Sequence, residues 1–298
     1  MQTFDAGRMK GQSLVGEYLV TQTSPIPVGK FFTTQDGFEL HYHEEGAPTA
    51  GKPSVLMLHG SGPGASGYTN FKGNFPFLAE HGYHVIVPDY LGYGLSSKPS
   101  DFLYKVDAQV DLLRELVAHT GAKSLAIVGN SLGGWFAIHH AIHHPAEVEK
   151  LVVMAPGGLE PPEDFVPHME GLRELFRIPT ERDFRVEAMR HLFNLFMEEP
   201  ADISDVVLEE RLEIARQQPV EVFSTMGGTP TTPRLKELKM PMLALWGYRD
   251  RFVPYRHSQY LLENVPDVHL ITSNRSGHWF MIEEADLFNQ ACLDFLER

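Results

Sequence analysis

The sequence predicts an α/β fold built on a mostly parallel sheet of about eight strands. Eight short apolar runs recur along the 298 residues, and most of them are apolar throughout, as strands covered on both faces are. Helical patterns separate the runs, most clearly over 106–120, where apolar residues return every three or four positions. The predicted strands are 31–34, 39–43, 54–59, 84–88, 124–129, 151–155, 242–246 and 269–272.

A hairpin and a helical insertion frame this alternation. Asp36-Gly37, between the first two runs, is a hairpin turn signal. From about 157 to 236 the strand rhythm stops, and helical patterns such as 187–196 and 206–216 replace it. The domain organisation that we expect is an N-terminal arm (1–30), a core (31–156 and 237–298) and a helical lid (157–236) inserted after the sixth strand.

Composition and charge argue against several classes of partner. A net charge of −14 disfavours nucleic acid and anionic membranes, because both require a basic surface. No apolar run is long enough to span a bilayer, and the N-terminus lacks the apolar stretch of a secretory signal. The single cysteine, Cys292, lies on a helical apolar face, where we expect it to pack in the core. The lack of a second cysteine fits a reducing cytoplasm.

Gly129-Asn130-Ser131-Leu132-Gly133 fits the G-x-S-x-G nucleophile elbow. A β-type run enters the motif and a helical run leaves it, which is the context that an α/β-hydrolase requires. The glycines let the neighbouring backbone pass close to a strained serine. We therefore predict that Ser131 is a nucleophile, against the alternative of an incidental glycine-rich turn.

A serine hydroxyl needs a base, and the base needs a carboxylate to orient it. In hydrolases of this fold the chain order is Ser, acid, His. Asp250 follows a late strand and His278 follows the last one, both in loops at carboxyl ends of strands. We predict a Ser131/His278/Asp250 triad. The alternatives are a loop-capping aspartate and a packed loop histidine.

The loop His59-Gly60-Ser61-Gly62-Pro63-Gly64 follows the third strand, where such enzymes place an oxyanion donor. We assign the oxyanion hole to the backbone N–H groups of Ser61 and Leu132. The rival interpretation is a dinucleotide fingerprint with Asp89 as its acid, but Pro63 interrupts the glycines and the strand is not the first of the sheet. We therefore expect no cofactor.

Two histidine pairs at a spacing of four residues could suggest a metal site. No carboxylate or cysteine completes either pair in sequence, so a solvated helix face is favoured and no metal is expected. The pairs are His139/His143 and His140/His144.

These residues resemble the meta-cleavage product hydrolases, a branch of the α/β-hydrolases that cleaves C–C bonds. The resemblance covers about 30–298 and is weakest in the lid, where 226–230 departs from the pattern. It lies in Gly60 to Ala65, Tyr68 to Phe71, Asn130, Ala155 to Gly158, Asp250 to Pro254, Gly277 to Trp279, Glu283 to Asp286, Phe288-Asn289, and the lid stretch from Glu210 to Pro219.

The resemblance implies a small anionic substrate, a 2-hydroxy-6-oxo-hexa-2,4-dienoate-type acid from ring fission, and an assembly of two or more subunits. The enol would first tautomerise to a keto form, and Ser131 would then attack the C6 ketone before C–C fission. An acyl-enzyme and a gem-diol both remain open as the intermediate. The implied substrate contacts are Arg211 on the carboxylate, Asn130 and Asn70 on the 2-oxygen and carboxylate end, Trp279 and Phe252 over the dienoate plane, and Gly62 and Val253.

Three alternatives remain beside this assignment. A surface lid arginine paired with Glu209 or Glu210 is the alternative for Arg211. A carboxylesterase or lactonase would use the same triad, and an inactive hydrolase fold could serve as a ligand receptor. Epoxide hydrolases and haloalkane dehalogenases are disfavoured because their nucleophile is an aspartate, whereas position 131 is serine.

Overall fold

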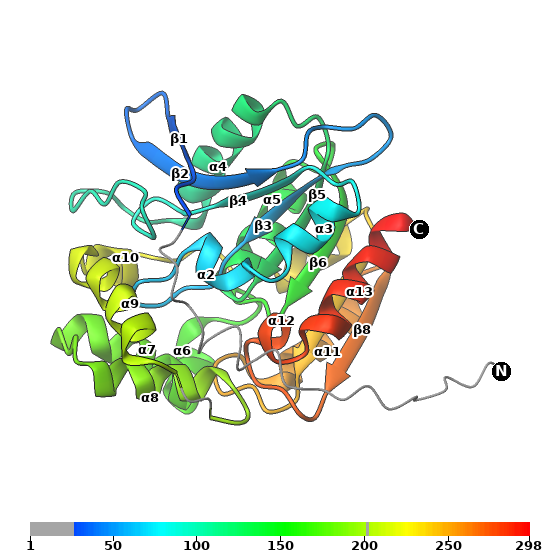
Figure 1. The fold of residues 1–298 in the computed structure, drawn as a ribbon. Coiled ribbons are helices and arrows are strands. Elements are labelled where there is room, and N and C mark those ends of the chain that lie inside the picture. The colour runs from blue at the N-terminus through cyan, green and yellow to red at the C-terminus, as the bar shows by residue number, and fades with distance from the viewer. Residues whose placement is uncertain (1–26, 201–202) are drawn as a thin grey trace.

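The computed structural model describes residues 27–200 and 203–298, which form one eight-stranded sheet with helices on both faces (Figure 1). The strand order is β1-β2-β4-β3-β5-β6-β7-β8. The β1–β2 and β2–β4 pairs are antiparallel and all other pairs are parallel. The strands are β1 (Lys30–Thr33), β2 (Glu39–Glu45), β3 (Ser54–Leu58), β4 (Val85–Pro88), β5 (Leu125–Asn130), β6 (Val148–Met154), β7 (Met242–Gly247) and β8 (Val268–Ser273).

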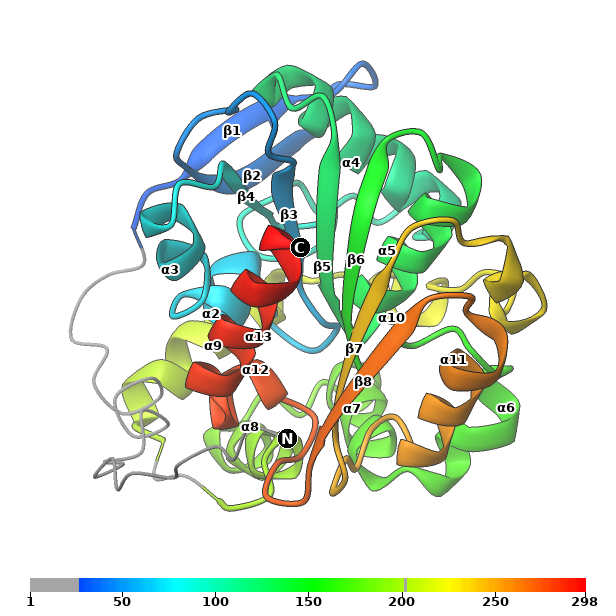
Figure 2. The same cartoon turned by 90° about the vertical axis from the view of Figure 1, so that its right-hand side faces the viewer.

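Helices cover the sheet on both sides, with α4 and α5 on one face and α3, α12 and α13 on the other (Figure 2). The central strands β3, β4, β5 and β7 are buried at every position, which explains their continuous apolar sequence. The helices outside the insertion are α2 (Gly67–Phe71), α3 (Phe75–Glu80), α4 (Val106–Thr120), α5 (Leu132–His143), η3 (Tyr255–His257), α11 (Ser258–Asn264), α12 (Phe280–Glu283) and α13 (Ala285–Glu297).

The predicted fold class is confirmed, and most strand limits differ by one or two residues. The exception is β6, which begins at Val148 rather than at Leu151. Glu149 and Lys150 break the apolar pattern there, but Lys150 is a strand residue whose ammonium group donates to the carbonyl oxygens of Phe295 and Leu296 at 3.0 and 2.8 Å. The start of β6 was therefore missed because a charged lysine, which bonds to the last carbonyl groups of α13, interrupts the apolar pattern of the strand.

The insertion between β6 and β7 is helical, as expected. Its helices gather beside the carboxyl ends of the central strands, apart from the bulk of the sheet (Figure 1). Of the expected N-terminal arm, residues 1–26 lie outside the described residues, and Lys30 already belongs to β1. The helices of the insertion are α6 (Pro162–Phe165), η1 (Val166–His168), α7 (Glu170–Glu181), α8 (Val186–Phe196), α9 (Asp205–Gln217), α10 (Glu221–Ser224) and η2 (Thr232–Glu237).

The histidine face of α5 is not wholly solvated, contrary to our expectation. His140 is buried and its Nε2 lies 2.9 Å from Glu147, and His139 meets Asp107 at 2.6 Å. Burial lowers the pKa of His140 to about 4, so this side chain is neutral at pH 7. Within the described residues no three His, Cys, Asp or Glu side chains are arranged to hold a metal ion. No described helix has the length and apolarity needed to cross a membrane.

We predict that Gly133→Ala destabilises the protein by at least about 2 kcal/mol, although alanine is the better helix former. A Cβ at position 133 would lie 2.0 Å from the carbonyl oxygen of Leu58, and backbone cannot yield as a flexible side chain does. Urea unfolding measures the loss. Gly227→Ala is the matched control, because its Cβ would meet only the end of Lys105 at 3.8 Å. Equal stability of the two variants would contradict this account.

Candidate active site

Ser131 occupies a strained turn between β5 and α5. Its φ of 55° and ψ of −113° place a non-glycine residue in a conformation that L-amino acids rarely adopt. The turn is held by its own backbone: the N–H of Ser131 donates to Met154 at 2.9 Å, and its carbonyl oxygen accepts from Trp135 and Gly157. Side-chain atoms at Gly129 or Gly133 would collide with backbone, so only glycine fits on either side of the serine. This is the geometry of a nucleophile elbow.

His278 and Asp250 come together from the loops after β8 and β7. The Nδ1 atom of His278 donates to Oδ2 of Asp250 at 2.7 Å, and both side chains are buried. The other oxygen, Oδ1, accepts from the backbone N–H groups of Phe252 at 2.7 Å and Val253 at 2.9 Å. With Oδ1 occupied, Asp250 presents Oδ2 to the imidazole, which leaves Nε2 of His278 as the free acceptor.

The loop that carries His278 lies against the serine turn. Nδ2 of Asn130, next to the serine, donates to the carbonyl oxygen of His278 at 3.4 Å. Among the described contacts no hydrogen bond joins Oγ of Ser131 to Nε2 of His278. In enzymes without bound substrate this bond is often long and tightens when substrate binds. The structure therefore shows Asp250 bonded to His278, and Asn130 joins the loop of His278 to the turn that carries Ser131.

The two predicted oxyanion donors border the same cavity. Ser61 and Leu132 line it together with Ser131. Leu132 is the first residue of α5, so its N–H has no partner within the helix. The loop of Ser61 is held by Asn70, whose Oδ1 accepts from the N–H of Gly60 at 2.9 Å. Asn70, predicted to bind substrate, thus also positions the oxyanion loop.

Arg211 is buried, and the structure excludes the alternative of a surface lid arginine. Its side chain comes from α9 and donates to the carbonyl oxygen of Pro63 at 3.0 Å and to Oγ1 of Thr69 at 2.7 Å. The guanidinium lies over the ring of Phe193 at 5.2 Å. No described carboxylate pairs with it, since Glu209 instead pairs with Arg216. Burial lowers the pKa of Arg211 to about 9, and the charge of Asp89 opposes this shift, so the group stays cationic at pH 7.

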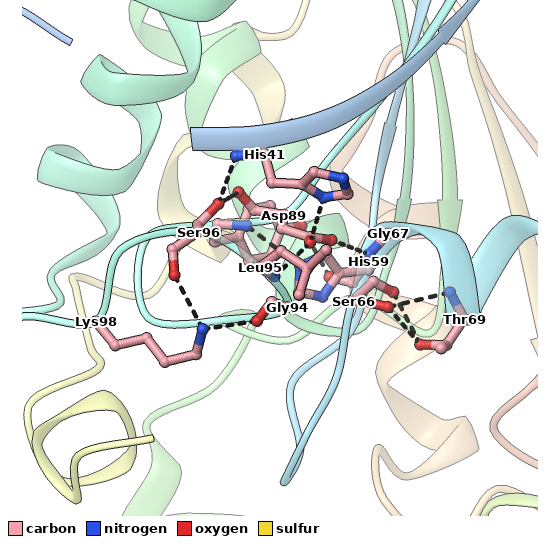
Figure 3. A network of polar contacts seen from close by, with 11 residues as sticks. His41, His59, Ser66, Gly67, Thr69, Asp89, Gly94, Leu95, Ser96 and Lys98 are labelled. Carbon is pink, nitrogen blue, oxygen red and sulfur yellow. Dashed lines mark hydrogen bonds and ion pairs between the residues drawn. The ribbon is translucent and has the colours of Figure 1, made fainter. Parts of the chain in front are cut away.

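Asp89 organises the loops that follow β3 and β4 (Figure 3). Its buried carboxylate accepts from Nδ1 of His41 at 2.8 Å and from the N–H groups of Gly67 at 2.7 Å and Leu95 at 2.9 Å. Burial opposes ionisation, but the bond and the charge of His41 hold the pKa of Asp89 below its usual value. The adjacent Ser66 hydroxyl meets Oγ1 of Thr69 at 2.9 Å, and Thr69 accepts from Arg211. The rival role for Asp89, a ribose ligand, conflicts with this full set of partners.

Phe252 and Trp279 form an aromatic stack around Phe196, a lid residue that the sequence did not single out. The ring of Phe196 lies 4.0 Å from that of Phe252 and 4.2 Å from that of Trp279, with interplanar angles of 3°. Phe252 also stacks on His278 at 4.9 Å. Within the described residues these rings face one another and are absent from the lining of the cavity at Ser131, so their predicted contact with substrate stays a prediction.

The cavity at Ser131 has a volume of about 400 Å³ and mostly apolar walls. Val253, a predicted substrate contact, lines it. Gly62 lies near the lid, where a Cβ would come within 4 Å of Leu175 and Phe196. Wall residues that sequence reasoning missed come from the lid and from α5: Trp135, Phe165, Leu172, Phe176, Phe223 and Met226.

Glu283 links the lid to the histidine loop, a function that the sequence did not reveal. Its two carboxylate oxygens accept from the N–H groups of Glu198 at 2.6 Å and Gly277 at 2.7 Å. Burial raises the pKa of Glu283 to about 7, while the two N–H donors oppose the shift. The N–H groups of His278 and Trp279 donate to the carbonyl oxygen of Phe196 beside this contact. The end of α8 therefore holds the loop of His278 directly.

Comparison with known proteins identifies the family of this chain. The model of the alpha/beta hydrolase family matches residues 55–291. A 2-hydroxy-6-oxo-6-phenylhexa-2,4-dienoate hydrolase of Burkholderia cepacia is 33% identical over 93% of this chain and 99% of its own. A 2-hydroxy-6-oxononadienedioate/2-hydroxy-6-oxononatrienedioate hydrolase of Paraburkholderia phymatum is 36% identical over 93% of this chain and 98% of its own.

Solved structures give the same result. A meta-cleavage product hydrolase from Pseudomonas fluorescens superposes with a TM-score of 0.79 at 27% identity, covering 91% of this chain and 98% of that one. The chain belongs to the α/β-hydrolase family. Within that family it is a member of the meta-cleavage product hydrolases.

We predict that Glu283→Gln flattens the pH dependence of stability between pH 5 and 7. A carboxyl whose pKa rises to about 7 on folding binds its proton more tightly in the folded state, so folding stability falls as pH rises through this window. The change is about 2 kcal/mol. Urea unfolding at pH 5, 6, 7 and 8 measures it, with the exposed Glu263→Gln as the control. An unchanged slope in Glu283→Gln would contradict the assignment.

Proposed function

We propose that this chain hydrolyses a C–C bond of a 2-hydroxy-6-oxo-hexa-2,4-dienoate-type acid through Ser131, His278 and Asp250. The observation that carries the proposal is the buried guanidinium of Arg211, which lies close to the loop of Ser61 and pairs with no carboxylate among the described residues. A buried cation without a counter-ion is costly unless a ligand supplies one. A dienoate supplies that carboxylate, and the planar guanidinium can hold it with two parallel hydrogen bonds.

Each residue has a defined task in the proposed reaction. His278 removes the proton from Oγ of Ser131, and Asp250 stabilises the resulting imidazolium. The serine oxygen adds to the C6 ketone, and the N–H groups of Ser61 and Leu132 stabilise the alkoxide. The C5–C6 bond then breaks, its electron pair passes to C5, and His278 returns the proton to that fragment. Prior tautomerisation of the 2-enol to a ketone allows the C5 fragment to leave as a stabilised carbanion.

Water completes the reaction on either of two routes. In the first, water hydrolyses the acyl group that cleavage of the C5–C6 bond leaves on Ser131. In the second, water takes the place of Ser131 as the nucleophile, adds to C6 with His278 as base and forms a gem-diol, whose C5–C6 bond then breaks to release the carboxylic acid. The first route leaves acyl label on Ser131 after a rapid quench, whereas the second leaves none. Both routes use the same oxyanion donors and the same carboxylate contact at Arg211, which Asn130 and Asn70 assist in this proposal.

The proposal includes the wider organisation of the protein. Residues 157–236 act as a lid on a core formed by 31–156 and 237–298, which is supported by the helices inserted between β6 and β7. The substrate is a small anion, and nucleic acid is not a partner, as the net charge of −14 favours. We place the enzyme in the cytoplasm because its one cysteine is buried and unpaired. A dimer or larger assembly rests on the family resemblance alone.

A carboxylesterase or lactonase with the same triad is the second candidate, favoured by the apolar cavity beside Ser131. The two functions differ in whether they require the charge of Arg211, because a neutral ester has no carboxylate for a buried cation to bind. Turnover of nitrophenyl esters far above that of dienoates would favour the second candidate. Labelling of Ser131 by a fluorophosphonate would exclude an inactive receptor.

Ser131→Ala should abolish cleavage of dienoates and of nitrophenyl esters alike, with a loss of about three or more decades in kcat. Loss of the coloured dienolate, followed spectrophotometrically, and release of nitrophenol measure the two activities. Ser258→Ala provides a control that removes a buried hydroxyl far along the chain. Retention of either activity in Ser131→Ala would contradict the proposed nucleophile.

Arg211→Gln should lower kcat/KM for the dienoate by about 100-fold while hydrolysis of a neutral nitrophenyl ester changes by less than about threefold. The glutamine keeps polar atoms near Pro63 and Thr69 but removes the charge. Arg211→Lys, which keeps the charge and loses the paired geometry, should fall between. An equal loss on both substrates would mean that the arginine is needed for folding or positioning rather than for the carboxylate.

A further inference from the structure

The cavity at Ser131 separates the two ends of any substrate that reacts there. Ser61, Ser131 and Leu132 border the cavity, which extends toward the lid through Phe165, Leu172 and Phe223. Arg211 does not line this space; it lies against Pro63 and Thr69, beyond the oxyanion loop. If the reacting carbonyl lies at Ser131 and the carboxylate lies at Arg211, the group on the other side of the carbonyl enters the cavity.

The walls of this cavity carry no positive charge. Among the described residues that line it, none is Lys, Arg or His, and the two ionisable groups are Glu160 and Glu163. Glu160 contacts Arg256 at 2.9 Å and also His257, so the charge of Arg256 already has a carboxylate partner. Glu163 is exposed at the N-terminal turn of α6. The remaining wall residues are almost all apolar.

We infer that the cavity accepts an uncharged, apolar C6 substituent and rejects one that carries a second carboxylate. This inference rests on the proposed function, because it assigns the C6 group of the dienoate to the cavity. A carboxylate entering the cavity would lose water without gaining a cation and would meet two like charges. For an alkyl or aryl group of the same size, transfer of its apolar surface from water into the cavity favours binding.

The similarity to known relatives does not indicate which type of substrate this chain prefers, whereas the inference does. Some relatives are named for a phenylhexadienoate and others for a nonadienedioate, a dioic acid. In this chain the cation is confined to one end of the site, and the apolar cavity occupies the other. The structure therefore favours the monoacid with an apolar C6 group.

The test compares matched charged and neutral substrates in two series. The first series contains dienoates whose C6 group is phenyl, 2-carboxyethyl, or the methyl ester of 2-carboxyethyl. The second contains the 4-nitrophenyl ester of succinic acid and its methyl ester, whose acyl chains enter the same cavity without any C–C chemistry. We expect kcat/KM of the charged member to be about 100-fold lower than that of its methyl ester in both series.

The two series distinguish failure of this inference from failure of the proposed function. A charged member within threefold of its methyl ester, in either series that turns over, overturns the inference. If no dienoate is cleaved but the succinate pair shows the bias, C–C hydrolysis is rejected and the preference of the cavity stands. Cleavage of the dienoates without a bias rejects the preference and leaves C–C hydrolysis intact.

Charge substitutions in the wall provide a gain-of-activity test. Leu172→Lys, with Leu172→Met as the matched control, should raise the ratio of kcat/KM for the succinate half-ester to kcat/KM for its methyl ester by about tenfold relative to the control. Leu172 is half-buried, so a lysine there can extend its ammonium group. Should Leu172→Lys fold poorly, the exposed Glu163→Lys replaces it, with Glu163→Gln as control. No gain in a folded lysine variant counts against the inference.

Discussion

The close backbone approach between β3, β5 and the first turn of α5 fixes the turn that carries Ser131, around which the other groups of the site gather. Gly129 and Gly133 let these segments come so close that any Cβ would collide with a carbonyl group, and the serine between them is forced to a φ of 55°. This strain aims the hydroxyl outward and brings the first free N–H of α5 beside it. The oxyanion loop after β3 is thereby placed against the same turn.

A second constraint is electrostatic. The protein carries a net charge of −14, yet its site contains a buried cation that no described carboxylate neutralises. Asp89 acts on Arg211 at a distance, because hydrogen bonds to His41, Gly67 and Leu95 already occupy its oxygens. Asp89 accepts from the N–H of Gly67, and the neutral side chain of the preceding Ser66 meets Thr69, which accepts from the guanidinium. The guanidinium therefore keeps donors for a ligand and remains charged.

The loop of His278 makes hydrogen bonds to both the core and the helical insertion. Its acid partner comes from the core, but the N–H groups of His278 and Trp279 donate to Phe196 at the end of α8, and Glu283 ties the same loop to Glu198. The stack of Phe252, Phe196 and Trp279 closes this contact. Substitutions in the lid should consequently change the position of the His278 imidazole as well as the wall of the cavity.

The fold class, the order of strands along the chain, the tight turn at Ser131 and the contact between Asp250 and His278 could be predicted from the sequence alone. Each rests on local information: apolar runs of buried strands, glycines that a tight turn requires, and loops that follow strands. The start of β6 could not be predicted, because Lys150 satisfies the distant end of α13. The sequence also did not predict the contacts of Phe196 and Glu283 or the apolar walls of the cavity, because the residues that meet there lie far apart in sequence. Only the tertiary structure showed that Arg211 is buried rather than on the surface, because the sequence of a helix does not indicate which other segments pack over it. Burial is also the reason that this cation requires a carboxylate from a ligand.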